Sequence, residues 1–407
     1  MKPGYKQTDV GVIPEEWEVS TVGREFEIKL GKMLDAEKNF GVPKPYLGNK
    51  AVQWDRIDIS DLPTVPMSRA DIERFRLRKG DLLVCEGGEV GRAAIWEAPL
   101  TECYFQKALH RLRPLRGFNS QVMAALLRQW SDRGLLTNYV TQTSIAHLPR
   151  EKFMEVPMPV PPLPEQRAIA EALSDVDALL GALDRLIAKK RDLKQAAMQQ
   201  LLTGQTRLPG FHGEWEVKRL GDVAMLKNGY AFKSDTYTSL GTYKVITIAN
   251  VQDGYMTADA CNTIASEPVD LQPHQRLRLG DILISMTGNV GRVCCVVEDH
   301  CLLNQRVGKL VPVGVVEGLL FVLLGQPSFI SAMTGAAKGG AQPNLSASDI
   351  TEHPLSIPKD AAEQTAIAGV LGEMDAELAG LEQRRKKTRA LKQAMMQELL
   401  TGRTRLI

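Results

Sequence analysis

The sequence has few of the features that mark a disulfide-bonded, secreted or membrane-inserted protein. Its 407 residues contain only six cysteines and no Cys-x-x-Cys pair, so a disulfide framework or a cysteine metal site is not expected. No apolar run reaches the roughly 18 residues of a membrane span, and Leu319–Leu324 is far too short. The first residues, Met1–Tyr5, lack the apolar core of a signal peptide. We therefore expect a soluble, cytoplasmic protein with reduced thiols.

An excess of charge of one sign is also absent. Fifty Lys and Arg residues oppose 48 Asp and Glu residues, which leaves a formal net charge of +2. This balance excludes a uniformly basic nucleic-acid coat, but it permits a basic face that is balanced elsewhere on the molecule. The length predicts two to four domains.

Motifs for catalysis are missing. Pro161-Pro162 follows Val160 and precedes Leu163, so the Asn/Asp-Pro-Pro-aromatic strand end of an amino-methyltransferase is not present. The Walker phosphate-binding motif is absent, and the glycines of Gly87–Gly91 and Gly288–Gly291 have the spacing of tight turns. The six histidines show no metal-ligand spacing. We expect no catalysis, no metal and no cofactor in this chain.

The chain is instead a tandem duplication with an offset close to 198 residues. Leu193–Gly204 returns almost unchanged as Leu391–Gly402. Further matches keep their order along the chain: Trp17–Val19 with Trp215–Val217, Gly80–Val84 with Gly280–Ile284, Val90–Arg92 with Val290–Arg292, and Glu165-Gln166 with Glu363-Gln364.

Each copy divides into a globular part and a long helix. Residues 17–159 and 215–358 are rich in Gly and Pro, and they predict mixed α/β domains whose sheet order cannot be deduced. The predicted strands include Asp81–Cys85, Tyr243–Ile248 and Asp281–Ser285, and the predicted short helices are Gln121–Trp130 and Val316–Leu324. Glu165–Thr203 and Glu363–Thr401 lack proline and predict helices, with a capping box at Asp360–Glu363 and C-terminal caps at Gly204 and Gly402. We therefore divide the chain into 1–160, 161–204, 205–358 and 359–407.

Apolar residues in both long helices alternate at spacings of four and three, as in a coiled coil. This seam consists of Ile169, Leu173, Val176, Leu180, Leu183 and Ile187 in the first helix, and of Ile367, Leu371, Met374, Leu378 and Leu381 in the second. Their matched length favours pairing of the two helices with each other, although each helix could instead pack on its own domain.

The lengths of the segments predict the direction of this pairing. A 39-residue helix is about 58 Å long, whereas a compact domain of this size is about 38 Å across. Because the linker Gln205–Gly213 is short, we expect an antiparallel pair with a globular domain at each end. The C-terminal Thr401–Ile407 stops where the linker Thr203–Trp215 continues, and the missing remainder is similar to Gly11–Trp17. The two termini should therefore meet in a pseudo-two-fold arrangement.

This organisation resembles the specificity (S) subunit of type I restriction-modification systems. The likeness covers nearly the whole chain and includes the repeated helix start around Glu165-Gln166 and Glu363-Gln364 and the repeated helix end Leu-Lys-Gln-Ala-x-Met-Gln-x-Leu-Leu-Thr-Gly. It implies a non-catalytic chain with two target-recognition domains, each of which recognises one half of a bipartite, asymmetric site in double-stranded DNA. It further implies that the helices set the gap between the halves and dock two methyltransferase (M) subunits, with motor-nuclease (R) subunits added for restriction in host defence. The partner subunits would use S-adenosylmethionine, and ATP with Mg. An enzyme with its own activity and a coiled-coil protein that never contacts DNA are the alternatives.

Candidate DNA contacts are polar and cationic residues on loops beside the matched strands, since such groups bind phosphates and base edges. In the first copy they are Lys29, Lys32, Asn49, Arg92, Lys107 and Gln142; in the second they are Lys227, Asn228, Tyr230, Lys233, Asn250, Arg292, Gln305, Arg306, Gln342 and Asn344. The matched Arg92 and Arg292 can also be structural. By residue type, Gln106-Lys107 corresponds to Gln305-Arg306.

The long helices also carry basic residues at Lys189–Arg191 with Lys194, and at Arg384–Lys387 with Arg389 and Lys392. These clusters form solvated helix faces, a path for DNA, or a docking surface for an acidic partner.

Overall fold

The computed structural model describes residues 3–35, 37, 39–142, 146–258, 261–339 and 343–406. The chain folds as two compact units: unit 1 comprises Met1–Asp184 and Gln383–Ile407, and unit 2 comprises Arg185–Glu382. Helix α5 (Leu163–Leu201) begins in unit 1 and ends in unit 2, and helix α10 (Ala361–Leu399) runs from unit 2 into unit 1. Each unit therefore contains a globular part and a portion of both long helices.

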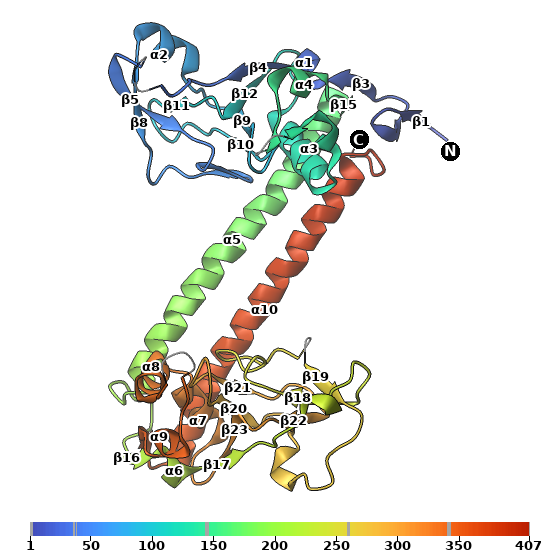
Figure 1. The fold of residues 1–407 in the computed structure, drawn as a ribbon. Coiled ribbons are helices and arrows are strands. Elements are labelled where there is room, and N and C mark those ends of the chain that lie inside the picture. Colours follow the sequence, from blue (N-terminus) through green and yellow to red (C-terminus); the bar gives the residue numbers. More distant parts are fainter. Residues whose placement is uncertain are drawn as a thin grey trace. The chain divides into compact units, whose positions relative to one another are not determined.

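The globular part of unit 1 is built around a four-stranded antiparallel sheet of order β10-β9-β12-β4 and a three-stranded sheet of order β11-β5-β8 (Figure 1). Strand β15 pairs with β3 beside them. The elements are β1 (Tyr5–Thr8), β2 (Gly11–Pro14), β3 (Glu18–Thr21), α1 (Val22–Glu25), β4 (Phe26–Leu30), β5 (Val42–Leu47), β6 (Val52–Gln53), β7 (Arg56–Ile57), β8 (Thr64–Met67), α2 (Arg69–Phe75), β9 (Leu82–Cys85), β10 (Ala93–Ile95), β11 (Tyr104–Phe105), β12 (Leu109–Pro114), α3 (Ser120–Asp132), the 3-10 helix η1 (Leu135–Tyr139), β13 (Thr141–Gln142), β14 (Ala146–His147), α4 (Arg150–Glu155) and β15 (Pro157–Val160).

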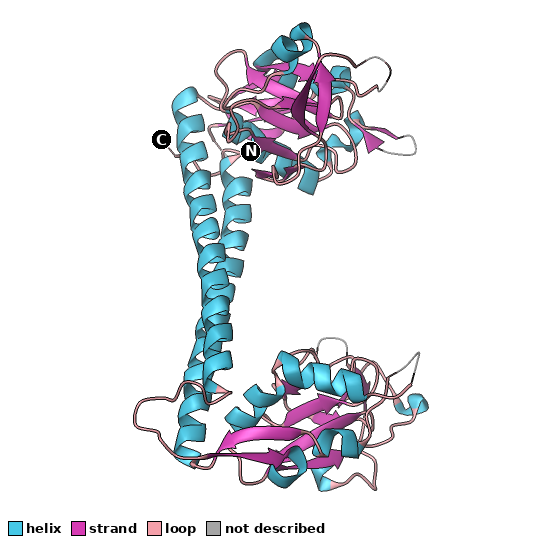
Figure 2. Ribbon diagram, turned by 90° about the vertical axis from the view of Figure 1, so that its left-hand side faces the viewer, coloured by secondary structure: helices cyan, strands magenta, loops and turns pink. Residues whose placement is uncertain are grey.

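Unit 2 repeats this topology. Its sheets have the orders β17-β23-β20-β21 and β19-β18-β22, and β16 pairs with β24 as β3 pairs with β15. Figure 2 shows that both globular parts combine strands with short helices. The elements are β16 (Trp215–Arg219), α6 (Leu220–Val223), β17 (Ala224–Asn228), η2 (Ser234–Thr236), β18 (Tyr243–Ile246), β19 (Asn262–Ile264), η3 (Pro273–Gln275), β20 (Ile282–Ser285), β21 (Val293–Cys295), β22 (Cys301–Leu303), β23 (Val307–Pro312), α7 (Glu317–Leu324), α8 (Pro327–Ala336), α9 (Ala347–Thr351) and β24 (Pro354–Pro358). Among the described residues no single helix is long and apolar enough to cross a membrane; α7 and α8 reach that length only together, across a bend of 64°.

The predicted mixed α/β class, the duplication and the long helices are confirmed, with small differences at the element ends. The predicted strand over Tyr243–Ile248 ends at Ile246, and both long helices begin two residues earlier and end two residues earlier than predicted. Gly204 and Gly402 have φ values of 69° and 67°, so both occupy the left-handed position that follows a helix end. The predicted capping box is only half correct: Asp360 accepts from the backbone N–H of Ala362, whereas the Glu363 carboxylate binds Arg207 instead.

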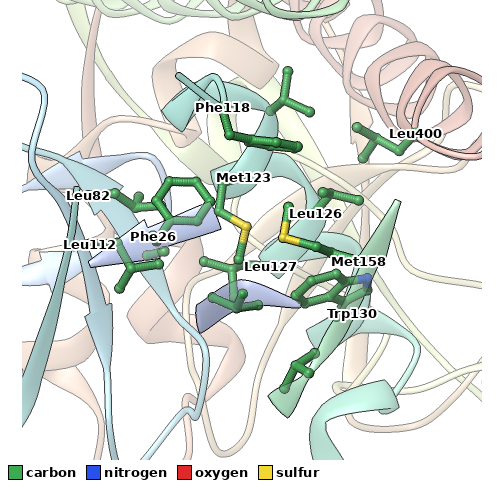
Figure 3. Packing of buried hydrophobic residues seen from close by; sticks show 14 of the residues in the cluster. Phe26, Leu82, Leu112, Phe118, Met123, Leu126, Leu127, Trp130, Met158 and Leu400 are labelled. Atoms are coloured by element: carbon green, nitrogen blue, oxygen red, sulfur yellow. The ribbon is translucent and has the colours of Figure 1, made fainter. Parts of the chain in front are cut away.

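The hydrophobic core of unit 1 lies between α3 and the four-stranded sheet. Figure 3 shows Met123 and Leu127 of α3 beside the sheet residues Phe26, Leu82 and Leu112. Trp130 of α3 lies next to Met158 of β15 in the same cluster. Leu400, at the end of α10, belongs to the same buried cluster, as do Ile169 and Leu173 of α5. The long helices are therefore part of the core of the globular domain, because their terminal turns supply buried side chains to it.

The two long helices pair in an antiparallel direction within each unit. In unit 1, Asp184 and Asp177 of α5 bind Arg385 (3.0 Å) and Lys392 (2.7 Å) of α10, so positions rise along one helix as they fall along the other. In unit 2, Lys190 pairs with Glu377 at 2.7 Å, and Lys194 pairs with Asp375. The predicted seam residues Ile169, Leu173, Leu183, Ile187, Ile367, Leu371 and Leu378 are buried, and Val176, Leu180, Met374 and Leu381 are half-buried. The predicted antiparallel pairing is confirmed.

The repeated Glu-Gln dipeptide has a structural role at each helix start. Glu165 is fully buried, accepts from the Trp17 indole at 2.8 Å and binds the guanidinium of Arg405 near the C-terminus. The matching Glu363 binds Arg207 of the linker with both carboxylate oxygens. The Tyr5 hydroxyl donates to the Gly402 carbonyl at 2.9 Å, so the N-terminal and C-terminal segments meet, as predicted.

Candidate nucleic-acid interface

A polar crevice of about 680 Å³ in unit 2 gathers four of the predicted DNA contacts. Asn228, Gln305, Arg306 and Asn344 line it, together with Gly229, Met286, Thr287, Leu345 and Ala347. They come from the end of β17, the residues after β20, the turn between β22 and β23, and the segment before α9. Residues separated by more than a hundred positions in the sequence thus share one concave surface.

Backbone contacts hold these segments in place. A Cβ on Gly229 would lie 2.1 Å from the Asn304 carbonyl oxygen, so only glycine permits this close approach. The backbone N–H of Met286 donates to Arg306 at 3.0 Å, and that of Leu345 donates to Met286 at 2.8 Å. The shape of the crevice is therefore set by backbone hydrogen bonds, and its chemistry is left to the side chains.

Several of these side chains keep donors that can meet a ligand. Gln305 and Arg306 are exposed at the turn, and neither side chain has a bonding partner among the described residues. The Asn344 side-chain oxygen accepts from the Thr287 hydroxyl at 2.8 Å, which leaves its NH₂ group without a partner in the described part of the chain. The available groups are thus guanidinium and amide donors, which are groups that contact base edges and phosphates.

Unit 1 has the same backbone arrangement with different side chains. A Cβ on Gly31 would lie 2.3 Å from the Phe105 carbonyl oxygen, Glu86 N–H donates to Ala108 at 3.0 Å, and Leu148 N–H donates to Glu86 at 2.7 Å. Gly87 forms an antiparallel bridge with His147, as Thr287 does with Asn344. Hence Lys107 occupies the place of Gln305, Ala108 that of Arg306, Glu86 that of Met286 and His147 that of Asn344.

This correspondence of backbone contacts corrects one pairing of residues between the two copies, and it adds residues that the sequence analysis missed. Lys32 bridges to Gln106 as Tyr230 bridges to Asn304, so Gln106 corresponds to Asn304 and not to Gln305. The repeated pattern of a glutamine followed by a cation shifted the match by one residue. Glu86, His147 and Thr287 were not selected; each follows a matched strand or turn, and the strand offset alone could have identified them.

The electrostatics of the matching segments of unit 1 differ from those of the unit 2 crevice. Burial raises the pKa of the Glu86 carboxyl, and the positive charges of His147 and Lys107 oppose this rise. Lys107 is exposed. Unit 1 therefore places an acceptor carboxylate where unit 2 has the apolar Met286.

Other residues predicted to contact DNA bind partners within their own domain through ion pairs or hydrogen bonds. Lys29 binds Glu27 (2.8 Å), and Lys32 binds Asp71 (2.8 Å) with most of its side chain buried. Arg92 donates to the Asn49 carbonyl at 2.9 Å, and Arg292 donates to the Gln252 side chain at 2.8 Å, so the matched arginines support their loops.

The remaining predicted residues fall into three groups. Asn49 donates to the Gly87 carbonyl, Tyr230 donates to Asp270 at 2.8 Å, and the buried Asn250 uses its side-chain amide to hold Thr247 and Thr257. Lys227 is half-buried on β17, and Lys233 is exposed. Gln342 and the side chain of Gln142 lie outside the described residues, and a DNA contact at any of these positions stays a prediction.

The basic clusters of the long helices are largely used between the helices. Lys190, Arg191 and Lys194 bind carboxylates of α10, and Arg385 and Lys392 bind carboxylates of α5. Arg384, Lys386, Lys387 and Arg389 are exposed. Ion pairing between the helices was not among the roles considered from the sequence, because the partner of each cation lies nearly 200 residues away.

The fold and the matched polar segments define a duplicated protein in which two similar globular parts share long helices and present different polar surfaces. Comparison with known proteins identifies the family to which this class of protein belongs. Residues 14–189 and 212–389 each match the family described as the type I restriction modification DNA specificity domain. The chain therefore belongs to the family of type I restriction-modification specificity subunits.

Individual relatives agree with this family. The chain is 25% identical to the putative type I restriction enzyme MjaX specificity subunit of Methanocaldococcus jannaschii, over 99% of this chain and 97% of the relative. It is 22% identical to the type I restriction enzyme EcoKI specificity subunit of Escherichia coli, over 68% of this chain and 62% of that one. A crystal structure of a type I restriction-modification S subunit from M. genitalium has the same fold, with a TM-score of 0.61, 17% identity and coverage of 98% of this chain and 99% of that chain.

Proposed function

We propose that each globular part recognises one half of a bipartite, asymmetric DNA sequence and that the chain itself catalyses no reaction. The observation that carries this proposal is a pair of matched surfaces, the crevice of unit 2 and the corresponding segments of unit 1. They share their backbone contacts, yet Gln305, Arg306 and Asn344 in unit 2 stand where unit 1 has Lys107, Ala108 and His147. Two identical surfaces would favour a palindromic site, whereas two different ones favour an asymmetric site.

Replacement of one globular part tests this proposal. Residues 17–159 are exchanged for the matching part of another specificity subunit, and the methylated DNA motif is mapped in a host that supplies the partner subunits. We expect one half of the motif to change and the other half to remain. The reciprocal exchange of residues 215–358 is the matched control and should change only the other half. A change in both halves after a single exchange would refute independent recognition.

We further propose that the helices set the gap between the two half-sites and dock two methyltransferase subunits, with motor-nuclease subunits in the restriction form. The support is the duplication, because two copies of one surface offer two equivalent docking positions. In this proposal the partner subunits use S-adenosylmethionine, and ATP with Mg. The complex acts on DNA in the cytoplasm. A native mass measurement should show one specificity chain with two methyltransferase subunits; saturation at one would contradict the proposed symmetry.

An assay with the purified chain also distinguishes this function from that of an enzyme with its own activity. Incubated with radiolabelled S-adenosylmethionine and target DNA, the chain alone should transfer no methyl group, whereas the complex should. Retention of DNA by the complex should weaken steeply as salt rises, since phosphate contacts release counterions. Retention that is insensitive to salt, or absent, would favour a protein that does not contact DNA.

A further inference from the structure

Arg306 lines the crevice of unit 2, and its guanidinium has no partner among the described residues, unlike that of several other arginines of this unit. Arg292 donates to Gln252, Arg276 binds Glu267 at 2.7 Å, and Arg207 binds Glu363. Arg306 lies on the turn after β22, where its backbone N–H donates to the side-chain oxygen of Asn304 at 3.2 Å and its backbone carbonyl accepts from Met286 N–H at 3.0 Å. Its side chain is exposed and has no partner among the described residues.

The surroundings of Arg306 suit an uncharged, acceptor-rich ligand edge. The lining residues around it are amides, a hydroxyl and apolar groups, and none of the lining residues is a carboxylate that would neutralise the guanidinium. The backbone of the turn is held by Met286 and Asn304, so the arginine projects from a fixed support. In unit 1 the same backbone position is Ala108, and the neighbouring position is the carboxylate of Glu86. The cation of this turn therefore stands one residue earlier in unit 1, at Lys107, and Arg306 has no basic counterpart at its own position.

Guanine presents two acceptors, O6 and N7, on its major-groove edge, and the planar fork of arginine donates to both at once. We propose that Arg306 recognises a guanine in the half-site of unit 2 and is a specificity-determining residue for that half-site. The proposal rests on the function proposed above. Unit 1 lacks this contact, because Ala108 carries no donor.

The test uses the complete complex and compares Arg306→Ala with Arg278→Ala as the control. Arg278 is also exposed, and no partner for its side chain lies among the described residues, but it precedes β20 at the end opposite to Met286. Binding is measured to duplexes that carry the mapped wild-type motif with each base of the half-site varied in turn. For Arg306→Ala we expect one guanine position to lose its discrimination by about 5- to 150-fold, with all other positions unchanged. Arg278→Ala should leave the preferences unaltered.

A modified base separates base contact from phosphate contact. Replacing the assigned guanine by 7-deazaguanine removes one acceptor, so it should weaken binding by the wild type and have little effect on Arg306→Ala. A loss that is equal for all sequences, with the salt dependence reduced by about one counterion, would make Arg306 a phosphate contact and overturn the proposal. Unchanged binding would also overturn it.

Failure of this inference and failure of the proposed function give different results. If exchange of residues 215–358 alters one half-site while Arg306→Ala alters none, the domain recognises DNA through other residues. If that exchange alters no half-site, the proposed function itself is wrong. Arg306→Lys is a further check, because a single ammonium should retain part of the discrimination if the arginine contacts a base.

Discussion

Removal of the Arg405 guanidinium should destabilise unit 1 and leave unit 2 unaffected. The Glu165 carboxylate is fully buried, and its partners are the Trp17 indole at 2.8 Å and the Arg405 guanidinium, whose terminal nitrogen lies at 3.0 Å. Arg405→Gln leaves this carboxylate with one neutral donor and no opposite charge. Arg405 also binds Glu16 at 2.9 Å, so the same change releases the C-terminal segment from the N-terminal one.

The expected size of this effect follows from burial. Removing one partner of a buried ion pair costs about 3–5 kcal/mol. The Arg405 side chain is 24% exposed, so water replaces part of the lost interaction and the cost falls to the lower end of this range or below it. We expect a loss of about 2–3 kcal/mol, which is a large fraction of the roughly 5–15 kcal/mol that stabilises a typical domain.

Hydrogen exchange followed peptide by peptide resolves the two units in the intact chain. Protection should fall in β1, β3 and the first turns of α5, and the protection of unit 2 should not change. Arg207→Gln is the matched control, because it breaks the equivalent pair with Glu363 and should act only on unit 2. A double-mutant cycle of Glu165→Gln and Arg405→Gln should give a coupling above 1 kcal/mol. A loss below about 0.5 kcal/mol, the range of an ordinary surface substitution, would refute the assignment of this pair as an anchor.

Three further predictions follow from the buried titratable groups and the helices. Burial lowers the pKa of His110 to about 4, against 6.5 in the unfolded chain, so the unfolded state takes up the proton first and unit 1 should lose up to about 3 kcal/mol of stability as the pH falls from 6.5 toward 4. Denaturation at several pH values should show this loss in the wild type and not in His110→Gln. Unit 2 has Gly308 at the matching position and should lack the loss. Because burial raises the pKa of Glu86, its charged form opposes folding above pH 4.5, so Glu86→Gln should stabilise unit 1 at pH 7 and the gain should disappear in acid; a gain that is independent of pH would contradict this cause. Seven residues inserted both between Leu180 and Lys189 and between Leu378 and Lys387 preserve the 4-3 seam and lengthen the helices by about 10 Å, so the mapped motif should gain about three unspecified base pairs; an active complex with the original gap would leave the helices a docking role alone.

The helices could be predicted from the sequence because their information is local and repeated. An apolar spacing of four and three indicates one face of a helix, and two seams of equal length indicate that the two helices pair with each other. The sheet order could not be predicted, because β12 pairs with β4 and β9 across long, irregular segments whose short strands differ little in pattern. The same difficulty limited the site. Residue type selected Arg306 and Asn344, which line the crevice, but it also selected Lys32 and Arg92, whose partners Asp71 and Asn49 come from distant segments.

The duplication explains how the two proposed recognition surfaces can diverge on one fold. Residues that the copies share act on the backbone: Gln166 accepts from Asn119 N–H and donates to the Pro161 carbonyl, and Gln364 does the same with Val316 and Pro358, each at 2.8 Å. Residues at which the copies differ, such as Arg306 and Ala108, stand on turns whose hydrogen bonds are made by main-chain atoms. A substitution at such an exposed position changes stability by about 0.5 kcal/mol or less, whereas loss of a base contact changes discrimination by about 1–3 kcal/mol. Under the proposed function, specificity can therefore change in one copy while the fold, the helix pairing and the other half-site remain as they were.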